Sequence, residues 1–365
     1  MSKTLRSIGL MSGTSLDGID VALLETDGER VVKRGPSATY AYNEGQQQML
    51  RHTLQDALAI KRRDERPGNL ASVEAALTDW HIKAVGSFLS THGLNDSTID
   101  VIGFHGQTVL HKPKEHLTVQ LADGRKLARA TGIPVVYDMR AADVAGGGQG
   151  APLVPIYHAA LAPTQPCAFV NIGGVGNVTF IGAEGTLMAF DTGPGNALIN
   201  DWMMKHKGLA FDEGGKACLS GTVSQKHLQA ALSQSYFQQK PPKSLDRNSF
   251  TKLDFSDLPF EDGAATLAAF TAHSIAASVR WASEWPAQWI ICGGGRHNAA
   301  IMQGLSTLLP NVTSADAIGL NGDSLEAEAW AYLAVRSLKG LPLSFPGTTG
   351  VKTALTGGNI ARPTD

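Results

Sequence analysis

The sequence has little of three features that would assign a protein quickly to a class. It contains only three cysteines in 365 residues, Cys167, Cys218 and Cys292. Their odd number, wide spacing and lack of a CxxC pair argue against a disulfide framework and against a zinc site, and fit a reducing cytoplasm. There is also no excess of one charge, since the formal net charge is -2, so the composition does not favour nucleic acid as a partner.

Long apolar runs are lacking as well. No segment approaches the roughly 20 apolar residues that a membrane-spanning helix needs, and the opening MSKTLRSIGL has no apolar stretch of the kind found in signal peptides. We therefore expect neither export nor membrane anchoring. With 43% hydrophobic and 18% charged residues, the chain has the composition of an ordinary globular protein, and its length favours two lobes over a single core.

The chain opens with two apolar, strand-like runs separated by a short segment rich in glycine and hydroxyl groups. This stretch is IGLMSGTSLDGIDVALLE, from Ile8 to Glu25, and it predicts two strands joined by a turn. The stretch CAFVNIGGVGNVTFIG, from Cys167 to Gly182, repeats the plan about 160 residues later. We interpret this recurrence as an internal structural repeat with a boundary at LAPTQP, Leu161 to Pro166. The expected lobes are residues 1–165 and 166–365.

Further strands and helices are predicted around these openings. Residues from Gly45 to about His92 indicate a long amphipathic helical element. Two strands that begin near Ile99 and Ile133 run into polar loops, in IDVIGFHGQTVLH and IPVVYDMRAADVAGGGQG; loops beyond strand ends are where α/β proteins usually bind ligands. The second half adds a helix-rich insertion and strand-turn-helix patterns at FDTGPGNALINDWM and WIICGGGRHNAAIM, then a final helix in NGDSLEAEAWAYLAVRSL.

Glycine-containing turns at the ends of apolar strands indicate phosphate binding. They are Gly13 to Gly18, Gly173 to Gly176, Gly193 to Gly195 and Gly293 to Gly295. Glycine permits a positive φ and a close backbone approach, so neighbouring N–H groups can converge on an anion. Any one of these turns alone is more often a hairpin turn. Neither GxGxxG nor GxxxxGK[ST] occurs in a strand-to-helix context, which weakens the Rossmann and P-loop interpretations.

Polar residues of the opening loop have a functional and a structural interpretation. Ser12, Thr14 and Ser15 offer hydroxyl donors, and Asp17 offers a carboxylate that would hold a divalent cation through water. Such a loop suits the β- and γ-phosphates of a nucleotide. The alternative is a tight hairpin turn at Asp17 and Gly18 with hydroxyls that satisfy the local backbone.

Two carboxylates are candidates for chemistry. Asp191 follows an apolar run and precedes TGPGN, so a strand end would give it the rigidity that a general base requires. The alternative for Asp191 is an Asx-turn or a helix N-cap. Glu326 follows Asp323 by three residues, which a capping box explains completely; the functional alternative is a carboxylate that holds a sugar hydroxyl or a water molecule.

Four polar residues of the first half, each predicted just beyond a strand, are candidates for ligand binding. They are His105, Gln107, Arg140 and Asp143, and their side chains suit hydrogen bonds to a polyhydroxylated or carboxylated ligand. Each of them, taken singly, is more often structural. For His105 the simple alternative is a buried histidine whose ring nitrogens are satisfied by the protein.

Six motifs in the same order resemble one family, the anhydro-N-acetylmuramic acid kinases of bacterial peptidoglycan recycling. They are GLMSGTSLDGIDVALLE, GFHGQTVLH, DVAGGGQGAPLVP, VNIGGVGNVT, FDTGPGN and CGGGRHNAAIM, and together they span nearly the whole chain. The resemblance implies an α/β protein with a two-lobed actin-like, ribonuclease H-like ATPase fold, in which duplicated mixed sheets are flanked by helices around a central cleft. It also implies ATP and Mg²⁺ as cofactors, an amino-sugar substrate, a cytoplasmic location and a homodimer, with neither nucleic acid nor membrane as a partner.

The resemblance implies a role for each matching residue. Asp191 would be the base that activates water for attack at C1 of the 1,6-anhydro ring while O6 takes the γ-phosphoryl group of ATP, giving N-acetylmuramic acid 6-phosphate; Glu326 would help orient the sugar. The metal ligand expected from the residues themselves stays Asp17, through water. The implied nucleotide-binding residues are Gly13, Thr14, Ser15, Leu16, Asp17, Gly18, Ile19, Asp20, Gly193, Gly195, Asn196, Gly293, Gly294 and Gly295. The implied substrate-binding residues are His105, Gln107, Arg140, Asp143 and Asn171.

Other functions stay open on the residues alone. One is an ATPase of the same superfamily that acts as a sensor or chaperone, and another is a catalytically silent sugar-binding protein. The polar set around His105 and Arg140 distinguishes a sugar kinase from the first alternative, because a sugar pocket needs such a set and a chaperone ATPase does not. The second alternative would show sugar affinity without formation of ADP. Arg296 and His297 are bulky polar residues after the last glycine turn, which leaves the contacts to the purine open.

Overall fold

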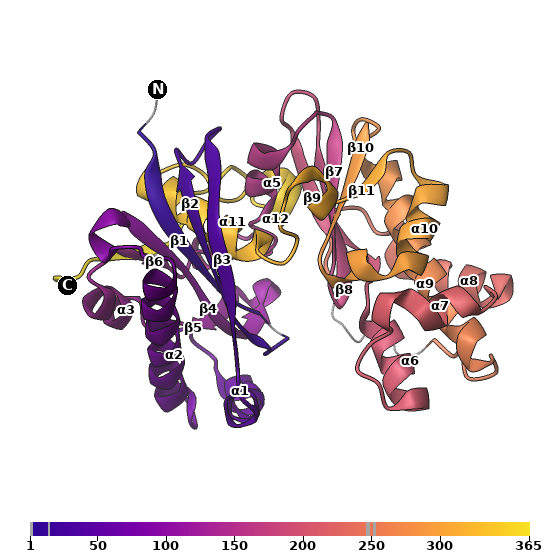
Figure 1. The fold of residues 1–365 in the computed structure, drawn as a ribbon, viewed down its shortest axis with the longest axis horizontal. Helices are drawn as coiled ribbons and strands as arrows, with labels where there is room; N and C mark the ends of the chain where they lie inside the picture. Colours follow the sequence, from indigo (N-terminus) through magenta and orange to yellow (C-terminus); the bar gives the residue numbers. More distant parts are fainter. Residues whose placement is uncertain (1–2, 14, 246–248, 251–252) are drawn as a thin grey trace. The chain divides into compact units, whose positions relative to one another are not determined.

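The chain divides into two compact units. The computed structural model describes residues 3–13, 15–245, 249–250 and 253–365. Unit 1 consists of Met1–Leu161 together with Ser324–Asp365, and unit 2 is Ala162–Asp323 (Figure 1). The first crossing of the chain thus falls in LAPTQP, as the prolines indicate. The expected second lobe, 166–365, needs correction, because the last 42 residues, counted from Ser324 to Asp365, belong to unit 1.

Unit 1 is built on a mixed sheet with the strand order β12-β6-β4-β1-β2-β3, and β5 pairs with the outer part of β4. Strands β1, β2 and β3 form an antiparallel meander, whereas β4 and β6 add in parallel on the other side of β1. The predicted strands around the opening turn are confirmed. The strands are β1 (Leu5–Ser12), β2 (Gly18–Thr26), β3 (Val32–Ala41), β4 (Val101–Lys112), β5 (Leu117–Leu121), β6 (Val135–Tyr137) and β12 (Asn359–Ala361).

Unit 2 repeats this plan, with the order β11-β10-β7-β8-β9. Its first three strands are again an antiparallel meander, and β10 and β11 again add in parallel beside the first strand. The five strands that the two sheets share have the same order and the same directions, which confirms the predicted repeat, the two mixed sheets and the ribonuclease H-like arrangement; β5 and β12 are additions in unit 1. The strands are β7 (Cys167–Ile172), β8 (Val175–Ile181), β9 (Leu187–Pro194), β10 (Gln288–Cys292) and β11 (Val312–Ser314).

Helices cover the sheets of both units. In unit 1 they are α1 (Glu44–Asp56), α2 (Leu70–Thr91), α3 (Gly124–Thr131), α4 (Ala141–Ala145), α5 (Pro155–Leu161), α11 (Leu325–Leu338) and α12 (Pro346–Thr349), with short 3₁₀ turns η1 (Ala57–Ala59), η2 (Asp96–Thr98) and η3 (Pro113–Glu115). In unit 2 they are α6 (Ala197–Lys207), α7 (Lys216–Ser220), α8 (Gln225–Leu232), α9 (Phe260–Ala277) and α10 (Ala299–Leu308), with η4 (Glu213–Gly215), η5 (Ser235–Gln238), η6 (Ser278–Trp281), η7 (Gly294–His297) and η8 (Asp316–Ile318).

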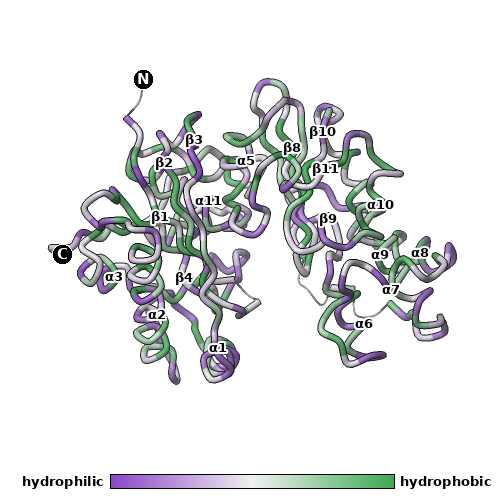
Figure 2. Tube along the Cα trace, in the orientation of Figure 1, coloured by the Kyte–Doolittle hydropathy of each residue, from purple (hydrophilic) through white to green (hydrophobic). Residues whose placement is uncertain are grey.

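Helix α11 explains why the C-terminal part returns to unit 1. It lies directly against β1 and β4 (Figure 1) because two strand glycines leave room for its backbone. A Cβ at Gly9 would lie 1.8 Å from the carbonyl oxygen of Ala327, and a Cβ at Gly103 would lie 2.1 Å from that of Trp330. The buried side chains of α11 then join those of β4 and β6 in one apolar cluster. Figure 2 shows the central strands mainly in green, whereas the solvent-facing α1 is largely purple.

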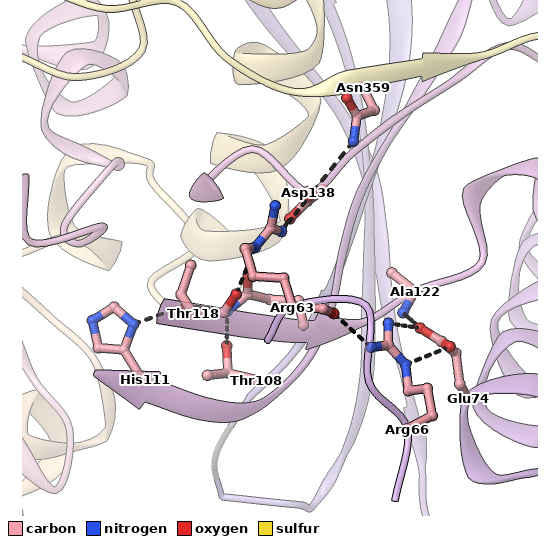
Figure 3. Close-up of polar contacts among 10 residues, drawn as sticks. Arg63, Arg66, Glu74, Thr108, His111, Thr118, Ala122, Asp138 and Asn359 are labelled. Carbon is pink, nitrogen blue, oxygen red and sulfur yellow. Dashed lines mark hydrogen bonds and ion pairs between the residues drawn. The ribbon is translucent and has the colours of Figure 1, made fainter. Parts of the chain in front are cut away.

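The predicted long helix between Gly45 and His92 is two helices. Helix α1 ends at Asp56 and α2 begins at Leu70, because Pro67 and Gly68 interrupt the helical pattern. Arginines fix the connection (Figure 3): the guanidinium of Arg63 lies 2.7 Å from Oδ2 of Asp138 and donates to the carbonyl of Thr118. The charged connection is therefore tied to β5 and to the end of β6.

Three site residues lie inside strands where the sequence predicts strand ends. His105 and Gln107 belong to β4, which continues to Lys112 because its pairing passes from β1 to β5 at a bulge next to Gly106, whose φ is +70°. Asp191 belongs to β9, beside an irregularity in the pairing with β8. A bulge turns a side chain away from the regular alternation of a strand, which is how a mid-strand residue becomes available to a site.

Candidate active site

The turn between β1 and β2 is compact and internally bonded. The Leu16 N–H donates to the Gly13 carbonyl at 3.3 Å, and Leu16 has a φ of +57°. The Ser15 hydroxyl donates to Asp17 Oδ1 at 2.8 Å, so its partner is a side chain and not the local backbone that the hairpin alternative predicts. The carboxylate of Asp17 is nevertheless exposed. Thr14 lies outside the described residues.

The two glycines that bracket this turn are required for different reasons. A Cβ at Gly18 would lie 2.6 Å from the carbonyl oxygen of Tyr40, so pairing of β2 with β3 already demands glycine there. A Cβ at Gly13 would meet nothing closer than the Ser15 hydroxyl at 3.4 Å. Ile19 is a core residue with 2% exposure, and Asp20 accepts a hydrogen bond from Thr39. Gly13 is therefore the position at which glycine is not explained by packing.

Gln107 holds this turn through hydrogen bonds to Ser12 and Gly13. Its Oε1 accepts from the Ser12 hydroxyl at 2.7 Å, and its Nε2 donates to the Gly13 carbonyl at 3.1 Å. The Ser12 hydroxyl also contacts the hydroxyl of Tyr42 at 2.8 Å. Ser12 and Gln107 are both buried, so the network holds the loop in place. The polar groups that the sequence suggests for a ligand are hydrogen-bonded within the protein instead.

The buried His105 and the half-buried Arg140 form a pair next to this network. The Arg140 Nε donates to His105 Nε2 at 3.1 Å, so the other ring nitrogen carries the proton and donates to the Ser12 carbonyl at 3.3 Å. Burial and the charge of Arg140 hold the pKa of His105 well below its ordinary value, so this histidine is neutral. Both ring nitrogens are satisfied by the protein, as the structural alternative predicts.

Asp143 fixes the glycine-rich loop that follows α4. Its Oδ2 accepts from the Gly150 N–H and its Oδ1 from the Thr349 hydroxyl, each at 2.6 Å. The Arg140 Nη1 donates to the Gly150 carbonyl at 2.8 Å. These bonds join three of the predicted substrate residues, His105, Arg140 and Asp143, to one loop; Gln107 reaches the same region through Ser12.

Glu326 lies close to the charges of this cluster. Loss of hydration raises the pKa of its carboxyl group, and the nearby charge of Arg140 opposes that rise while Asp20 and Asp17 add to it. Although protein surrounds it, the side chain reaches solvent. The capping-box explanation is wrong, because the N-cap of α11 is Ser324 and Asp323 binds Arg296 instead.

Asp191 has a different environment in unit 2. Its Oδ2 accepts the N–H of Leu245 at 2.7 Å, and its backbone N–H donates to the carbonyl of Lys243 at 3.1 Å. The Tyr236 hydroxyl donates to the Asp191 carbonyl. These partners are distant in sequence and the N-cap of α6 is Asn196, so neither the Asx-turn nor the N-cap alternative applies. Burial raises the pKa of Asp191 to about 6, against the Leu245 N–H and the charge of Lys243.

The amide groups after Asp191 are used by the protein itself. The N–H groups of Gly195 and Asn196 donate to the carbonyls of Gly174 and Gly173 at 2.9 and 2.7 Å. A Cβ at Gly195 would lie 2.2 Å from the Gly173 carbonyl oxygen, and one at Gly193 would lie 2.5 Å from the Ser274 hydroxyl. Close packing therefore explains both glycines.

Open glycines lie instead in the turn between β7 and β8. At Gly173 and Gly174 a Cβ would meet nothing closer than 3.7 and 3.8 Å. By the internal repeat, this turn corresponds to the turn between β1 and β2. The sequence indicated both the turn and its likeness to the opening loop, but Gly173 and Gly174 were left out of the expected nucleotide-binding residues; what the sequence did not reveal is that these two glycines have open space.

The last glycine turn borders a pocket of about 330 Å³ in unit 2. Gly294 has open space, because a Cβ there would meet only the side-chain amide of Asn196, at 3.8 Å. A Cβ at Gly293 would lie 2.2 Å from Asn171, and a Cβ at Gly295 would lie 2.2 Å from Ile172. Asn171 is thus a neighbour of this turn and belongs to unit 2, whereas the other four predicted substrate residues belong to unit 1. The pocket is lined by Asn196, Ile199, Asn200, Phe211, Asp212, Gly214, Gly294, His297 and Asn298.

Arg296 turns away from that pocket. Its guanidinium donates to Asp316 and Asp323 at 2.7 and 2.8 Å, and the hydrogen bond with Asp323, opposed in part by burial, raises its pKa. Arg296 is therefore a structural residue, and His297 is the one of the two bulky residues that lines the pocket. Phe211 has 60% exposure and offers an aromatic ring at the pocket edge.

Membrane and metal criteria give no candidates in the described residues. No helix within them combines the length and apolar character required to cross a bilayer. Nor do they contain a cluster of at least three acidic, histidine or cysteine side chains arranged as a metal site.

Two sheets that share one strand order, each with an open glycine turn after its first strand, are the arrangement of the actin-like ATPase fold. The chain belongs to the anhydro-N-acetylmuramic acid kinase family, whose model matches residues 5–363. It therefore belongs to a family of ATP-using kinases that act on this anhydrosugar.

Relatives of the same description are similar over their full length. An anhydro-N-acetylmuramic acid kinase of Methylorubrum extorquens is 52% identical, covering 98% of this chain and 99% of that protein. One from Rhodopseudomonas palustris is 51% identical, covering 98% and 100%. Among solved structures, component A of the (R)-2-hydroxyglutaryl-CoA dehydratase of Acidaminococcus fermentans aligns over 92% of this chain and 99% of that chain at 11% identity, with a TM-score of 0.48. This last likeness is too distant to bear on activity.

Proposed function

We propose that the protein opens 1,6-anhydro-N-acetylmuramic acid with water and transfers the γ-phosphoryl group of ATP to O6, giving N-acetylmuramic acid 6-phosphate and ADP in peptidoglycan recycling. The observation that carries the proposal is Asp191, a carboxylate fixed by backbone partners with a pKa of about 6. Such a group is ionised at neutral pH and still basic enough to accept a proton from water. Membership of the kinase family supports the substrate.

In this reaction Asp191 takes the proton from the water that attacks C1. The bond between C1 and the bridging oxygen breaks, and that oxygen becomes O6, which forms the new bond to the γ-phosphorus as ADP leaves. Because Oδ2 of Asp191 accepts the Leu245 N–H, we assign proton acceptance to Oδ1. Phosphoryl transfer itself depends mainly on positioning and on charge stabilisation.

The nucleotide is assigned to glycine turns that packing does not explain. Gly13 and the Gly173–Gly174 turn, which are equivalent in the repeat, would face phosphates with their backbones. The pocket beside Gly294 has a volume in the range of small-ligand sites, and we assign the nucleoside to it, with Phe211 as a stacking surface. Gly18, Gly193, Gly195, Gly293 and Gly295 keep the turns closely packed and act indirectly.

Mg²⁺ is assigned to the acidic group of unit 1. Asp17 is exposed, and the charges of Asp17 and Asp20 both reach Glu326. Mg²⁺ commonly binds through one or two carboxylates, with water and substrate phosphates completing its shell, so a few carboxylates without a complete protein cage fit this ion. When bound, it would supply positive charge to the phosphates.

The amino sugar is assigned to the surface that Arg140 and Glu326 share. Arg140 is held by His105 and the Gly150 carbonyl, which fixes a cation beside the Glu326 carboxylate. A fixed cation suits the lactyl carboxylate of the substrate, and a carboxylate suits its hydroxyl groups. His105, Gln107 and Asp143 then serve mainly to position this surface, and Asn171 supports the glycine turn of unit 2.

Product analysis tests the reaction. Incubation with ATP, Mg²⁺ and the anhydrosugar in H₂¹⁸O should give a 6-phosphate with the label at the anomeric oxygen, read by mass spectrometry promptly after quenching. Unlabelled product kept in the same water controls for exchange. Label in the phosphate, or ADP without sugar phosphate, would overturn the proposal and favour an ATPase of another function; sugar binding without ADP would indicate a silent binding protein.

The family resemblance also supports a homodimer in the cytoplasm as part of this proposal. Light scattering during gel filtration tests the dimer, and a mass equal to one chain at micromolar concentration would contradict it. Fractionation of the producing cells tests the location.

A further inference from the structure

The segment that closes over Asp191 carries a lysine that the reaction above does not use. After η5 the chain returns through Lys240, Pro241 and Pro242, and the backbone of Lys243 and Leu245 brackets Asp191 with two hydrogen bonds. The carbonyl of Lys243 accepts the Asp191 N–H. This bond fixes the backbone of Lys243 next to Asp191.

Aromatic rings and a carbonyl hold the ammonium group of Lys243. Its Nζ donates to the Tyr236 carbonyl at 3.1 Å and lies 4.3 Å from the centre of the Tyr236 ring and 5.6 Å from that of Phe190. Tyr236 and Phe190 are both buried, and the Tyr236 hydroxyl bonds to the Asp191 carbonyl. The same tyrosine thus holds both the lysine and the aspartate.

Lys243 is close enough to Asp191 for their charges to interact, although no direct hydrogen bond joins the side chains among the described residues. Among the described residues, the other groups that face the pair are the Tyr236 phenol, whose pKa burial raises, and the guanidinium of Arg280 from η6. Burial lowers the pKa of Lys243 to about 8, Arg280 adds to this effect and Asp191 opposes it. The ammonium group is therefore charged at neutral pH.

We propose that Lys243 is a positioning residue that keeps the Asp191 carboxylate ionised while it is shielded from water. The proposal rests on the proposed function, in which Asp191 is the base. A shielded carboxylate without a direct ion-pair partner tends to take up a proton and lose its function. A cation held nearby by aromatic rings, and not bonded to the carboxylate among the described residues, opposes this protonation.

The pH dependence of kcat/KM separates this role from a purely structural one. For the wild-type protein we expect activity to fall below pH 6 as Asp191 becomes protonated. Lys243→Met removes the charge but keeps an unbranched apolar chain between the rings. The acidic limb should then move up by roughly one pH unit, which is about a fivefold loss at pH 6 and a loss under about twofold above pH 8, where the wild-type lysine is itself losing its proton.

Three variants serve as controls for this experiment. Lys243→Arg retains the charge, and its acidic limb should coincide with that of the wild type. Lys240→Met removes an exposed lysine from the same segment and should leave the profile unchanged. Tyr236→Phe retains the aromatic ring and removes the hydroxyl bond to Asp191, so its loss should be the same at every pH. Lys243→Gln repeats the charge removal should the methionine variant not fold.

The outcomes also separate this proposal from the one on which it rests. An acidic limb that stays in place in Lys243→Met and Lys243→Gln, or a loss of equal size at every pH, would overturn the role of Lys243. Asp191→Asn tests the proposed base independently: if that variant keeps near-normal turnover, the base assignment fails first, whatever the lysine variants do.

Discussion

Units 1 and 2 share one strand order but hold their site residues in different ways. In unit 1 the polar side chains bind one another: Gln107 supports the Gly13 turn, and Arg140 is fixed by His105 and the Gly150 loop. In unit 2 Asp191 is held by the backbone of a segment outside the repeat. The repeat therefore supplied the glycine turns, and an insertion after β9 created the environment of the proposed base.

The strongest test of this difference between the units is to remove the proposed base, Asp191, from unit 2. Asp191→Asn retains the shape and the bond to the Leu245 N–H but cannot accept the proton, so we expect turnover to fall by roughly 10²–10⁴-fold. Calorimetric affinities for ATP and for the sugar should stay within about threefold of the wild type. The matched change in unit 1, Glu326→Gln, should lower turnover less, because it removes an orienting group and not a base. Equal losses in both variants would contradict the distinction.

Two glutamates of α11, Glu326 and Glu328, differ in exposure to solvent. Glu328 is 2% exposed and accepts bonds from Arg34, Tyr157 and Ser324. We expect Glu328→Ala to cost about 3 kcal/mol of folding free energy, because it leaves buried partners without their acceptor. Denaturant unfolding measures it. Glu326→Ala, in the same turn of α11 but at a side chain that reaches solvent, should leave the unfolding midpoint nearly unchanged and lower activity instead.

Glycine replacements sharpen the contrast between turns that pack and turns that face a ligand. Gly195→Ala places a Cβ 2.2 Å from the Gly173 carbonyl oxygen, and we expect a loss of about 1–3 kcal/mol in stability. Gly294→Ala meets only open space and should fold normally while binding ATP more weakly in a calorimetric titration. Gly13→Val is the corresponding variant of unit 1. Unchanged ATP affinity in both folded variants would argue against phosphate and nucleoside roles for these turns.

The last expected effect is on the dependence of stability on pH. The pKa of Asp191 is about 6 in the fold and about 3.9 when unfolded, so the folded state binds the proton more tightly. The free energy of unfolding therefore decreases as pH rises from about 4 to about 6, so the protein becomes less stable, and the whole of this loss of stability is present at pH 7.5. We expect Asp191→Asn to melt at a higher temperature than the wild type at pH 7.5 and at the same temperature near pH 4. A variant that is less stable than the wild type at pH 7.5 would contradict the unfavourable burial of this charge.

The amino-acid sequence by itself determined the repeat, the glycine turns, the boundary at LAPTQP and the family. These features depend on local patterns. Apolar strands that flank glycines, and prolines at the boundary between the two halves, can be recognised without knowledge of the tertiary contacts. Local patterns were also enough to show that Pro67 and Gly68 lie inside the predicted long helix, but the break they cause was missed because the amphipathic spacing on either side continued.

Only the tertiary structure decided what each glycine and carboxylate does. Gly13 and Gly18 look alike in the sequence, yet the strand beside Gly18 excludes a side chain and nothing excludes one at Gly13. Asp191 could have been a turn residue until Leu245, 54 positions later, supplied its partner. The return of α11 to unit 1 likewise depends on Gly9 and Gly103, which admit its backbone. Steric exclusion, desolvation and charge act between residues that are distant in the chain, so they become defined only when the fold brings those residues together.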